Sequence, residues 1–455
     1  MSRGLGDVYK RQFKTHTALL IISNTITIIP YLYFLSLSKE QSLSAALAFA
    51  LFYTFRMTGV FFLQTLTALF APSLLAASVL IGGAGALVGI LSTWWSVALL
   101  PAAGLLGISA SWLPPADLMV RQKAKLTEQP LKNDWKEALF FLFVLLFALR
   151  LSDDLQGVGL FGSYFALFVL AAKSSQTFNN LPKRPLMQRN QLFNKQFLLY
   201  FFFFLLLFGL RAARLIKSNA LFEWAITGFL FLFALLLITL TKRSRSWKQP
   251  LHLNVLTFIR GVIGNFLFLF GSVYVTGRFG AQALSTHVYL PYALGLFGAM
   301  FLGGKLAHRL EKQLVPTYLL GLMAGVLLFS SDTLIPISLF VISFFNAGLN
   351  QWLTKQYLTA KPEAIEQQSL AKYATQSKGS LVHQFLLMTL LFVILRFEHQ
   401  PLAFLFQLSG TTATNQTSRI QSFLEPAKWG SIAGVLCLLV GGLVVFYRQL
   451  KKTKV

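Results

Sequence analysis

Long apolar runs separated by short polar segments recur along the whole chain. Runs such as QFLLYFFFFLLLFGL and GFLFLFALLLITL, with their flanks, come near the roughly 20 residues that a helix needs to cross the hydrocarbon core of a bilayer. This pattern predicts an all-α polytopic membrane protein with about fourteen transmembrane helices. The predicted spans are 16–36, 43–68, 72–92, 94–113, 137–152, 156–172, 196–215, 219–240, 253–276, 283–304, 315–330, 333–352, 380–396 and 428–447.

Composition supports a membrane protein. The chain is 55 % hydrophobic and 12 % charged, and it contains 45 phenylalanines in 455 residues. A soluble protein has roughly 45–50 % apolar and 25 % charged residues. The longest polar stretches, at about 114–136, 173–195, 355–380 and 397–427, are too short for a separate soluble domain.

The net charge of +25 would suggest nucleic acid as a partner in a soluble chain. Here the basic residues fall mainly in alternate loops, so the positive-inside rule accounts for them, and we expect no nucleic acid partner. The pattern predicts an even number of spans with both termini cytoplasmic. The predicted cytoplasmic set includes Arg121, Lys123, Lys125, Lys305, Arg309, Lys355, Lys361, Lys372 and Lys378, and the opposite side holds mainly Lys39, Arg278, Arg396, Arg419 and Lys428.

One basic group is on the wrong side for this rule. The segment RAARLIKS contains Arg211, Arg214 and Lys217. We interpret it as a helix end whose arginines turn inward to the protein.

Several chemistries find no support. The single cysteine, Cys437, excludes an intrachain disulfide and a cysteine metal cluster. A GxxxxGK[ST] phosphate-binding loop is absent, and the histidines are scattered, so we expect no ATP hydrolysis, no metal site and no cofactor. The stretch DVYKRQ reads as a translated adaptor from a sequencing library, and we interpret residues 1–12 as a cloning or assembly scar.

A glycine-patterned helix end carries the first family resemblance. The stretch GLFGAMFLGGKLAHRLEKQLVPTYLLGLM resembles the signature loop of the major facilitator superfamily, with Gly295, Gly303, Gly304, Lys305, His308 and Arg309 in the motif. The resemblance implies that His308, where the family has aspartate, latches two helices, and that Arg309 binds helix-end carbonyls. The alternative is an ordinary helix end with positive-inside charges.

Other stretches narrow the resemblance. SNTITIIPYLYF, with Ser23, Asn24, Thr25 and Pro30, is similar to the first-helix motif of the fourteen-spanning drug:proton antiporter branch, although Ser23 takes the place of the motif's acid. LAKYATQSKGSLVHQFLLMTL resembles the thirteenth helix of that branch. The resemblance implies two six-helix bundles at 13–172 and 246–455, with two extra central helices at 173–245. The loop QTLTALFAPSLL lacks the acid and the basic residues of the family's signature.

Two arginines lie deep within predicted spans. Inserting an arginine at such depth in the membrane costs roughly 2.5–3.5 kcal/mol unless it is paired or faces a cavity. Arg56 and Arg260 are therefore both candidates for substrate contact. They would suit an anionic or zwitterionic substrate. Alternatively, they snorkel or bond to backbone carbonyls.

The proton-carrying acid expected from the resemblance is missing. Asp153 or Glu223 could take over this role, although carboxylates at span boundaries are usually solvated or lie at a helix N-terminus. Asn265 and Gln384 could line a central path, or they could join helices by hydrogen bonds.

These features favour a secondary transporter that exports small amphipathic compounds by alternating access, rather than an enzyme. The alternatives are a lipid or lipid-linked glycan flippase and a membrane-embedded transferase. We expect multi-pass insertion in a bacterial inner membrane, with lipid and a small-molecule substrate as partners. The resemblance further implies a periplasmic adaptor and an outer-membrane channel.

Overall fold

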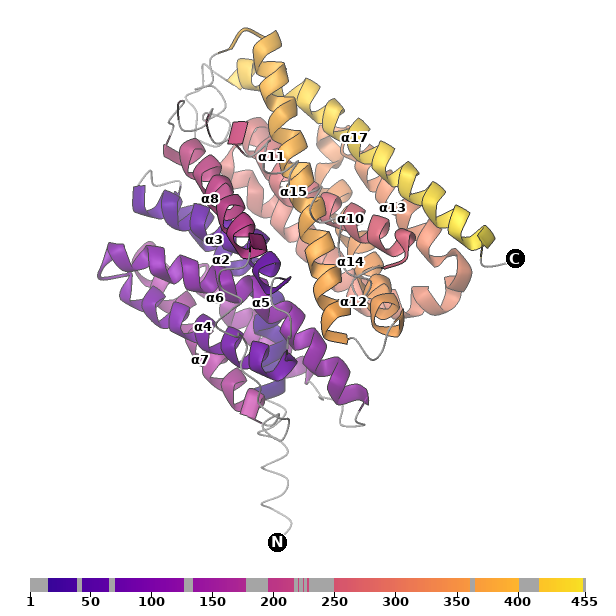
Figure 1. The fold of residues 1–455 in the computed structure, drawn as a ribbon. Coiled ribbons are helices and arrows are strands. Elements are labelled where there is room, and N and C mark those ends of the chain that lie inside the picture. Colours follow the sequence, from indigo (N-terminus) through magenta and orange to yellow (C-terminus); the bar gives the residue numbers. More distant parts are fainter. Residues whose placement is uncertain are drawn as a thin grey trace. The chain divides into compact units, whose positions relative to one another are not determined.

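A computed structural model describes residues 15–38, 43–64, 70–126, 134–176, 195–216, 249–360, 365–400 and 417–452, with isolated positions between 220 and 228. Within these ranges, all regular structure is helical (Figure 1). The proposed scar at 1–12 and most of the predicted span 219–240 lie outside the described residues.

The helices have the length and composition of membrane spans. In the described part of the chain, nine helices are long and apolar enough to cross a bilayer, or ten if a bent pair at the N-terminal end is one span. Two shorter apolar helices lie at Tyr200–Ala212 and Leu314–Leu328. The fold is therefore all-α and polytopic, while the count of fourteen spans stays a prediction.

The chain divides into two compact units, which are described separately. Unit 1 comprises residues 1–243 and 363–370, and unit 2 comprises residues 244–362 and 371–455. The division into bundles at 13–172 and 246–455 with two extra helices between them stays a prediction.

Unit 1 is built around one long central helix. Its elements are a helix at Thr15–Thr25, α2 (Ile29–Ser38), α3 (Leu43–Gln64), α4 (Ala71–Leu91), α5 (Leu99–Leu126), α6 (Trp135–Ala148), α7 (Asp153–Gln176) and α8 (Lys195–Ile216). Helix α5 packs against α3 and α4, α4 also packs against α7, and α3 packs against α8. The approach of α5 to α3 is close, because a Cβ atom at Gly107 would lie 2.8 Å from the carbonyl oxygen of Phe52.

The first span of unit 1 is bent. Helix Thr15–Thr25 and α2 meet at an angle of 47° across residues 26–28. Pro30 follows the break, and proline has no N–H to continue the hydrogen-bond ladder back to residue 26. The bend therefore follows from the proline of the first-helix motif.

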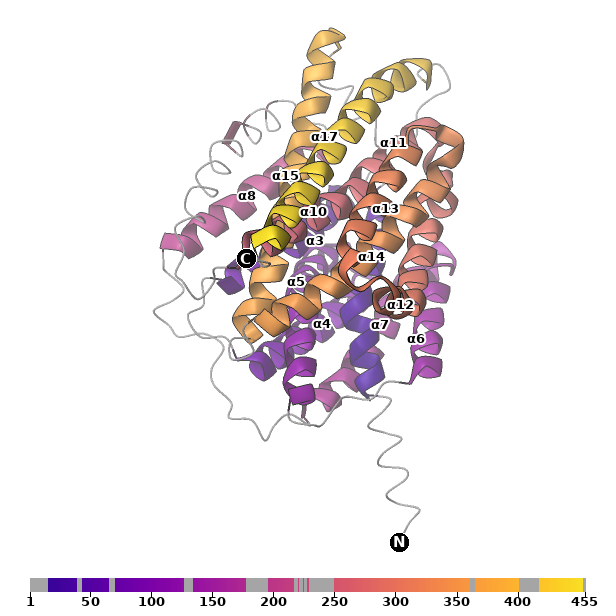
Figure 2. The ribbon, with the colours of Figure 1, turned by 90° about the vertical axis from the view of Figure 1, so that its right-hand side faces the viewer.

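Unit 2 begins with a span of three consecutive segments, α10 (Leu251–Asn265), a π-helical turn η4 (Phe266–Phe270) and α11 (Gly271–Phe279). It continues with η6 (Ser285–Tyr289), α12 (Leu290–Leu310), α13 (Leu314–Leu328), η8 (Asp332–Leu334), α14 (Ile335–Ala360), α15 (Ile365–Phe397, in this unit from residue 371) and α17 (Thr417–Lys452). Helix α14 packs against α12, α13 and α10, and α17 lies beside α10 and α13 (Figures 1 and 2).

Several helices are longer than the hydrophobic pattern predicts. Parts of the polar stretches at 114–136, 355–380 and 397–427 are helical, as extensions of α5, α15 and α17. Charged residues in these extensions therefore lie on helices that pack against their neighbours, and not in loops. This difference decides where the candidate site residues are found.

Candidate functional site

Unit 1 gathers two arginines around aromatic rings. The guanidinium carbon of Arg56, on α3, lies 5.3 Å from the centre of the Tyr31 ring and 5.8 Å from that of Tyr53. Arg211, on α8, is buried, with its guanidinium carbon 3.8 Å from the Tyr53 ring centre and a hydrogen bond of 3.1 Å to Thr54 Oγ1. Aromatic faces attract cations most strongly where water is excluded. The inward orientation expected for the RAARLIKS arginines is confirmed for Arg211.

Unit 1 contains an ion pair with a buried acid that the hydrophobic pattern does not predict. Asp117, on α5, is 5 % exposed, and both of its carboxylate oxygens accept hydrogen bonds from Arg121 Nε, at 2.8 and 2.9 Å. Ser23 Oγ donates a third hydrogen bond to Asp117, at 2.9 Å. Arg121 also binds the backbone carbonyl of His16, whose ring Nδ1 lies 2.6 Å from Ser174 Oγ. The cluster joins the first span to α5 and α7.

A sequence signal for this pair was available. Asp117 and Arg121 are four residues apart, the spacing at which an acid and a base meet on one helix face. Between them lie Leu118, Met119 and Val120, which are apolar and typical of a span. The prediction that the span ends at residue 113 placed both charges in a polar stretch, and the structure corrects that boundary.

The residues of the predicted first-helix motif make different contacts. Ser23 contacts the carboxylate of Asp117, while Asn24 is exposed and donates to a backbone carbonyl one turn earlier. Thr25 is buried, and its Oγ1 accepts a hydrogen bond of 3.1 Å from Tyr164. Ser23 thus lies next to an acid that another helix supplies.

Unit 2 holds two cations in a different environment. Lys372, on α15, is 2 % exposed, and its Nζ donates to Thr354 Oγ1 on α14 at 2.5 Å. The positive charge of Arg260, on α10, acts on Lys372, and Arg260 itself interacts with Tyr373 and Tyr292. Among the described residues, no carboxylate forms an ion pair with either cation. The expected position of Lys372 in a loop is therefore wrong, because α15 begins earlier than expected, while its position toward the cytoplasmic side stays a prediction.

Two glycines bring α10 and α15 together at this position. A Cβ atom at Gly261 would lie 2.0 Å from the carbonyl oxygen of Gln376, and one at Gly379 would lie 2.0 Å from that of Phe258. No side chain fits at such distances, so both positions require glycine. The reciprocal contact lies next to Arg260 on α10 and, at Gln376, one turn beyond Lys372 on α15.

A second polar contact joins the same two helices. Asn265 Nδ2 lies 3.1 Å from His383 Nδ1, and the His383 ring also packs edge-on against Phe266. Asn265, His383 and the predicted path residue Gln384 are all buried. For Asn265 the contact favours helix association over the lining of a path.

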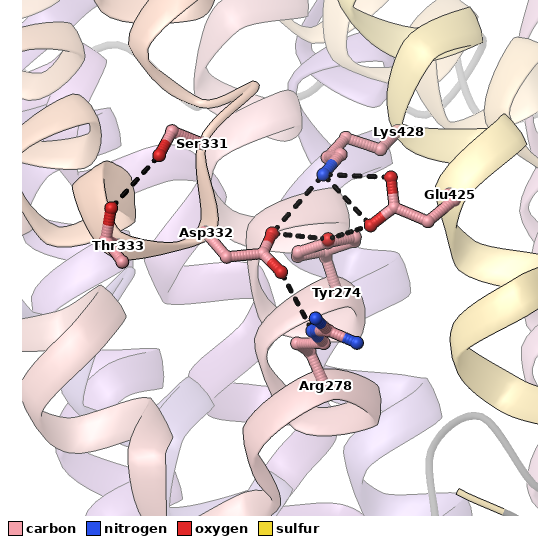
Figure 3. Close-up of polar contacts among 7 residues, drawn as sticks. All are labelled: Tyr274, Arg278, Ser331, Asp332, Thr333, Glu425 and Lys428. Atoms are coloured by element: carbon pink, nitrogen blue, oxygen red, sulfur yellow. Dashed lines mark hydrogen bonds and ion pairs between the residues drawn. The ribbon is translucent and has the colours of Figure 1, made fainter. Parts of the chain in front are cut away.

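A balanced network of charges lies elsewhere in unit 2 (Figure 3). Asp332, on η8, accepts hydrogen bonds from Arg278 Nε at 2.8 Å and from Tyr274 Oη at 2.7 Å. Lys428, on α17, is 4 % exposed and lies 3.3 Å from Asp332 Oδ1 and 3.0 Å from Glu425 Oε1. Tyr274 Oη also lies 3.0 Å from Glu425 Oε1, so its single proton is shared between the two carboxylates. The network ties α11, η8 and α17 together with two acids and two bases.

The predicted signature loop contains two close helix contacts. A Cβ atom at Gly295 would lie 2.5 Å from the carbonyl oxygen of Phe340, and one at Gly303 would lie 2.8 Å from Gln351 Oε1, so both glycines admit α14 against α12. Gly304 has no atom within 4 Å of such a position. Small residues therefore serve packing at 295 and 303.

The basic part of that loop is exposed. Lys305, His308 and Arg309 lie on the last turns of α12 with exposed side chains. In the described ranges, no side-chain hydrogen bond or ion pair joins any of the three to another residue. Their roles as latch and helix cap stay predictions.

No side-chain contacts are described for Asp153 and Glu223, the two acids proposed to replace the missing proton-carrying acid. Asp153 begins α7, at the N-terminal position expected of a boundary carboxylate, and its side chain is not described. Glu223 lies outside the described residues. Their predicted role as proton sites stays a prediction.

The described residues contain no group of three histidine, cysteine or acidic side chains that could hold a metal ion. In comparisons with known proteins, no model of a protein family matches the chain, and no curated protein is detectably similar to it. The fold and its buried charges define an all-α, multi-pass membrane protein.

Proposed function

We propose that the protein is a secondary active transporter, built on the two-bundle plan of the fourteen-spanning branch of the major facilitator superfamily. It exports small amphipathic compounds across the bacterial inner membrane by alternating access. The observation that carries this proposal is the burial of ionisable side chains inside helices of both units, Asp117, paired with the half-buried Arg121, in unit 1 and Lys372 in unit 2. Such residues are rare within membranes because burying a charge is unfavourable, and they mark substrate and ion pathways.

The coupling carboxylate in this proposal is Asp117. A proton relay needs an acid held inside the bundle. The family resemblance predicts that acid at position 23, which is a serine in this chain. The carboxylate of Asp117 lies 2.9 Å from the Ser23 hydroxyl. Protonation of Asp117 would remove the charge that holds Arg121, and it would loosen the connection between the first span and α5.

An enzymatic role has less support. A transferase needs a nucleophile or a general base within reach of a group that orients it. The polar clusters of the described residues are ion pairs and helix contacts. A flippase has one observation in its favour, since the buried Lys372 and the half-buried Arg260, which form no ion pair with a described carboxylate, suit an anionic head group.

Transport into proteoliposomes tests the proposal. The substrates are a panel of lipophilic cations and anionic amphiphiles, with and without an imposed pH gradient, for the full chain, Asp117→Asn and the control Asp134→Asn. Asp134 caps the N-terminus of α6, where asparagine caps equally well. We expect gradient-driven transport that Asp117→Asn abolishes and Asp134→Asn retains.

Two further results would contradict parts of this scheme. Unchanged gradient dependence in Asp117→Asn would exclude Asp117 as the coupling site and direct the test to Asp153→Asn and Glu223→Gln. The absence of gradient-driven movement for every compound, from a protein with native helicity, would refute a coupled transporter. Arg56→Ala, measured in the same assay, reports whether the cation beside Tyr31 and Tyr53 contributes to transport.

A further inference from the structure

Lys372 is buried without an acid beside it among the described residues of unit 2. Its side chain is 2 % exposed, its Nζ donates a hydrogen bond to the neutral hydroxyl of Thr354, and the nearby guanidinium of Arg260 carries a positive charge. Removing a charge from water costs several kcal/mol, which a protein normally offsets with an opposite charge. In the described part of unit 2 no carboxylate provides it.

The Arg260 guanidinium has spare hydrogen-bonding capacity. Its Nε is buried and has no hydrogen-bond partner among the described residues. Arg260 as a whole is only half-buried, so part of its side chain remains accessible. An N–H donor held in this way needs an acceptor.

We propose that Arg260 and Lys372 form a binding site for a phosphate group, with the guanidinium and the ammonium as its two anchors. A guanidinium binds phosphate through parallel hydrogen bonds, and an ammonium binds it as a point charge. Two positive charges match the charge of a phosphate monoester better than that of a single carboxylate. The Thr354 hydroxyl, which contacts Lys372, lies within the same cluster.

The local architecture makes this site rigid. Glycines 261 and 379 hold α10 and α15 in backbone contact beside the two cations. A site on packed helices keeps its donors in place without ordering a loop on binding. The two basic side chains therefore stay near each other in the absence of a ligand, and a bound phosphate would supply the negative charge that their surroundings lack.

The site deepens the proposed function, because it names a substrate class for the transporter. A phosphate group could belong to a soluble phosphate ester or to a phospholipid head group, and both share the same chemistry. The test is a binding measurement, so that it can fail independently of transport.

The experiment measures binding of radiolabelled inorganic phosphate to the full chain in phosphatidylcholine nanodiscs. Competitors are glycerol phosphate, short-chain phosphatidic acid and acetate. We expect Lys372→Met and Arg260→Gln each to weaken phosphate binding by about 10–100-fold, the effect of losing a charge-assisted hydrogen bond. Lys372→Arg retains the charge and should retain most of the binding. Arg309→Gln, which removes an exposed charge on α12, is the matched control.

The outcomes distinguish a soluble phosphate ester from a lipid head group, and they test the phosphate site separately from the proposed transporter. Stronger competition by glycerol phosphate supports a soluble ester, and stronger competition by phosphatidic acid supports a lipid head group. Equal competition by acetate, equal binding in Lys372→Met and Arg260→Gln, or no phosphate binding by the folded protein would overturn the site. Phosphate binding without transport of any compound would refute the transporter and leave the phosphate site intact. Transport of other compounds without phosphate binding would refute the phosphate site and leave the transporter intact.

Discussion

Two charged clusters in unit 2 differ in one decisive respect. The network around Asp332 contains two acids and two bases, and each of them has an oppositely charged neighbour. The pair of Arg260 and Lys372 contains two bases, and the neighbours found for them among the described residues are neutral. Both clusters involve a cation that is at least nine-tenths buried, Lys428 in the first and Lys372 in the second.

The comparison separates structural charges from functional ones. A balanced network stabilises a set of helix contacts, and the removal of one member leaves the others without a partner. An unbalanced pair destabilises the fold, so its retention points to a ligand that completes it. Substitutions that remove a charge should therefore have opposite effects on stability in the two clusters.

The largest effect is expected from Gly379→Ala. The new methyl group would lie 2.0 Å from the Phe258 carbonyl oxygen, and two backbones would have to move apart. We expect a loss of about 3 kcal/mol or more in unfolding free energy, measured by SDS titration in bicelles, together with loss of phosphate binding. The control is Gly264→Ala on α10, where a Cβ atom meets nothing within 4 Å. Equal stability of the two variants would contradict the close helix contact.

Asp332→Asn should be the next most severe. The change leaves Arg278 without its acid and leaves buried Lys428 with Glu425 alone. Breaking a fully buried ion pair costs about 3–5 kcal/mol, and because Asp332 is partly exposed we expect about 2 kcal/mol in the same titration. Unchanged stability would show that the network is not a structural tie.

Lys372→Met should change stability in the opposite direction. Methionine has a similar length and removes an uncompensated charge from the interior, so we expect a gain of about 1–2 kcal/mol in unfolding free energy. The gain should accompany the loss of phosphate binding. A loss of stability comparable to that of Asp332→Asn would place Lys372 among the structural charges and would remove the contrast between the clusters.

Glu425→Gln should have the smallest effect. The Glu425 side chain is 41 % exposed, and water screens its attraction to Lys428. Glutamine can still accept the hydrogen bonds of Tyr274 and Lys428. We expect a loss below about 1 kcal/mol. A larger loss would mean that the balance of charge within the network matters more than the burial of each member.

The class of the protein and some of its helix contacts could be predicted from the sequence alone. Apolar runs indicated an all-helical membrane protein, and the glycines at 295 and 303 do lie at close helix contacts. The inward position of Arg211 followed from its conflict with the positive-inside pattern. Asp117 fell in a predicted polar stretch, Lys372 in a predicted loop and Lys428 at the predicted start of the last span, although all three are buried in helices.

The reason for these errors is physical. Hydrophobicity along the chain sums over neighbouring residues, so a span appears to end where charges begin. A helix can continue past that point when its charged side chains find partners on other helices, as Asp117 does with Ser23 and Lys428 with Asp332. The sequence determined how much of the chain must leave water. Only the tertiary structure decided which charges are compensated, because compensation depends on the side chains that neighbouring helices bring within hydrogen-bonding distance.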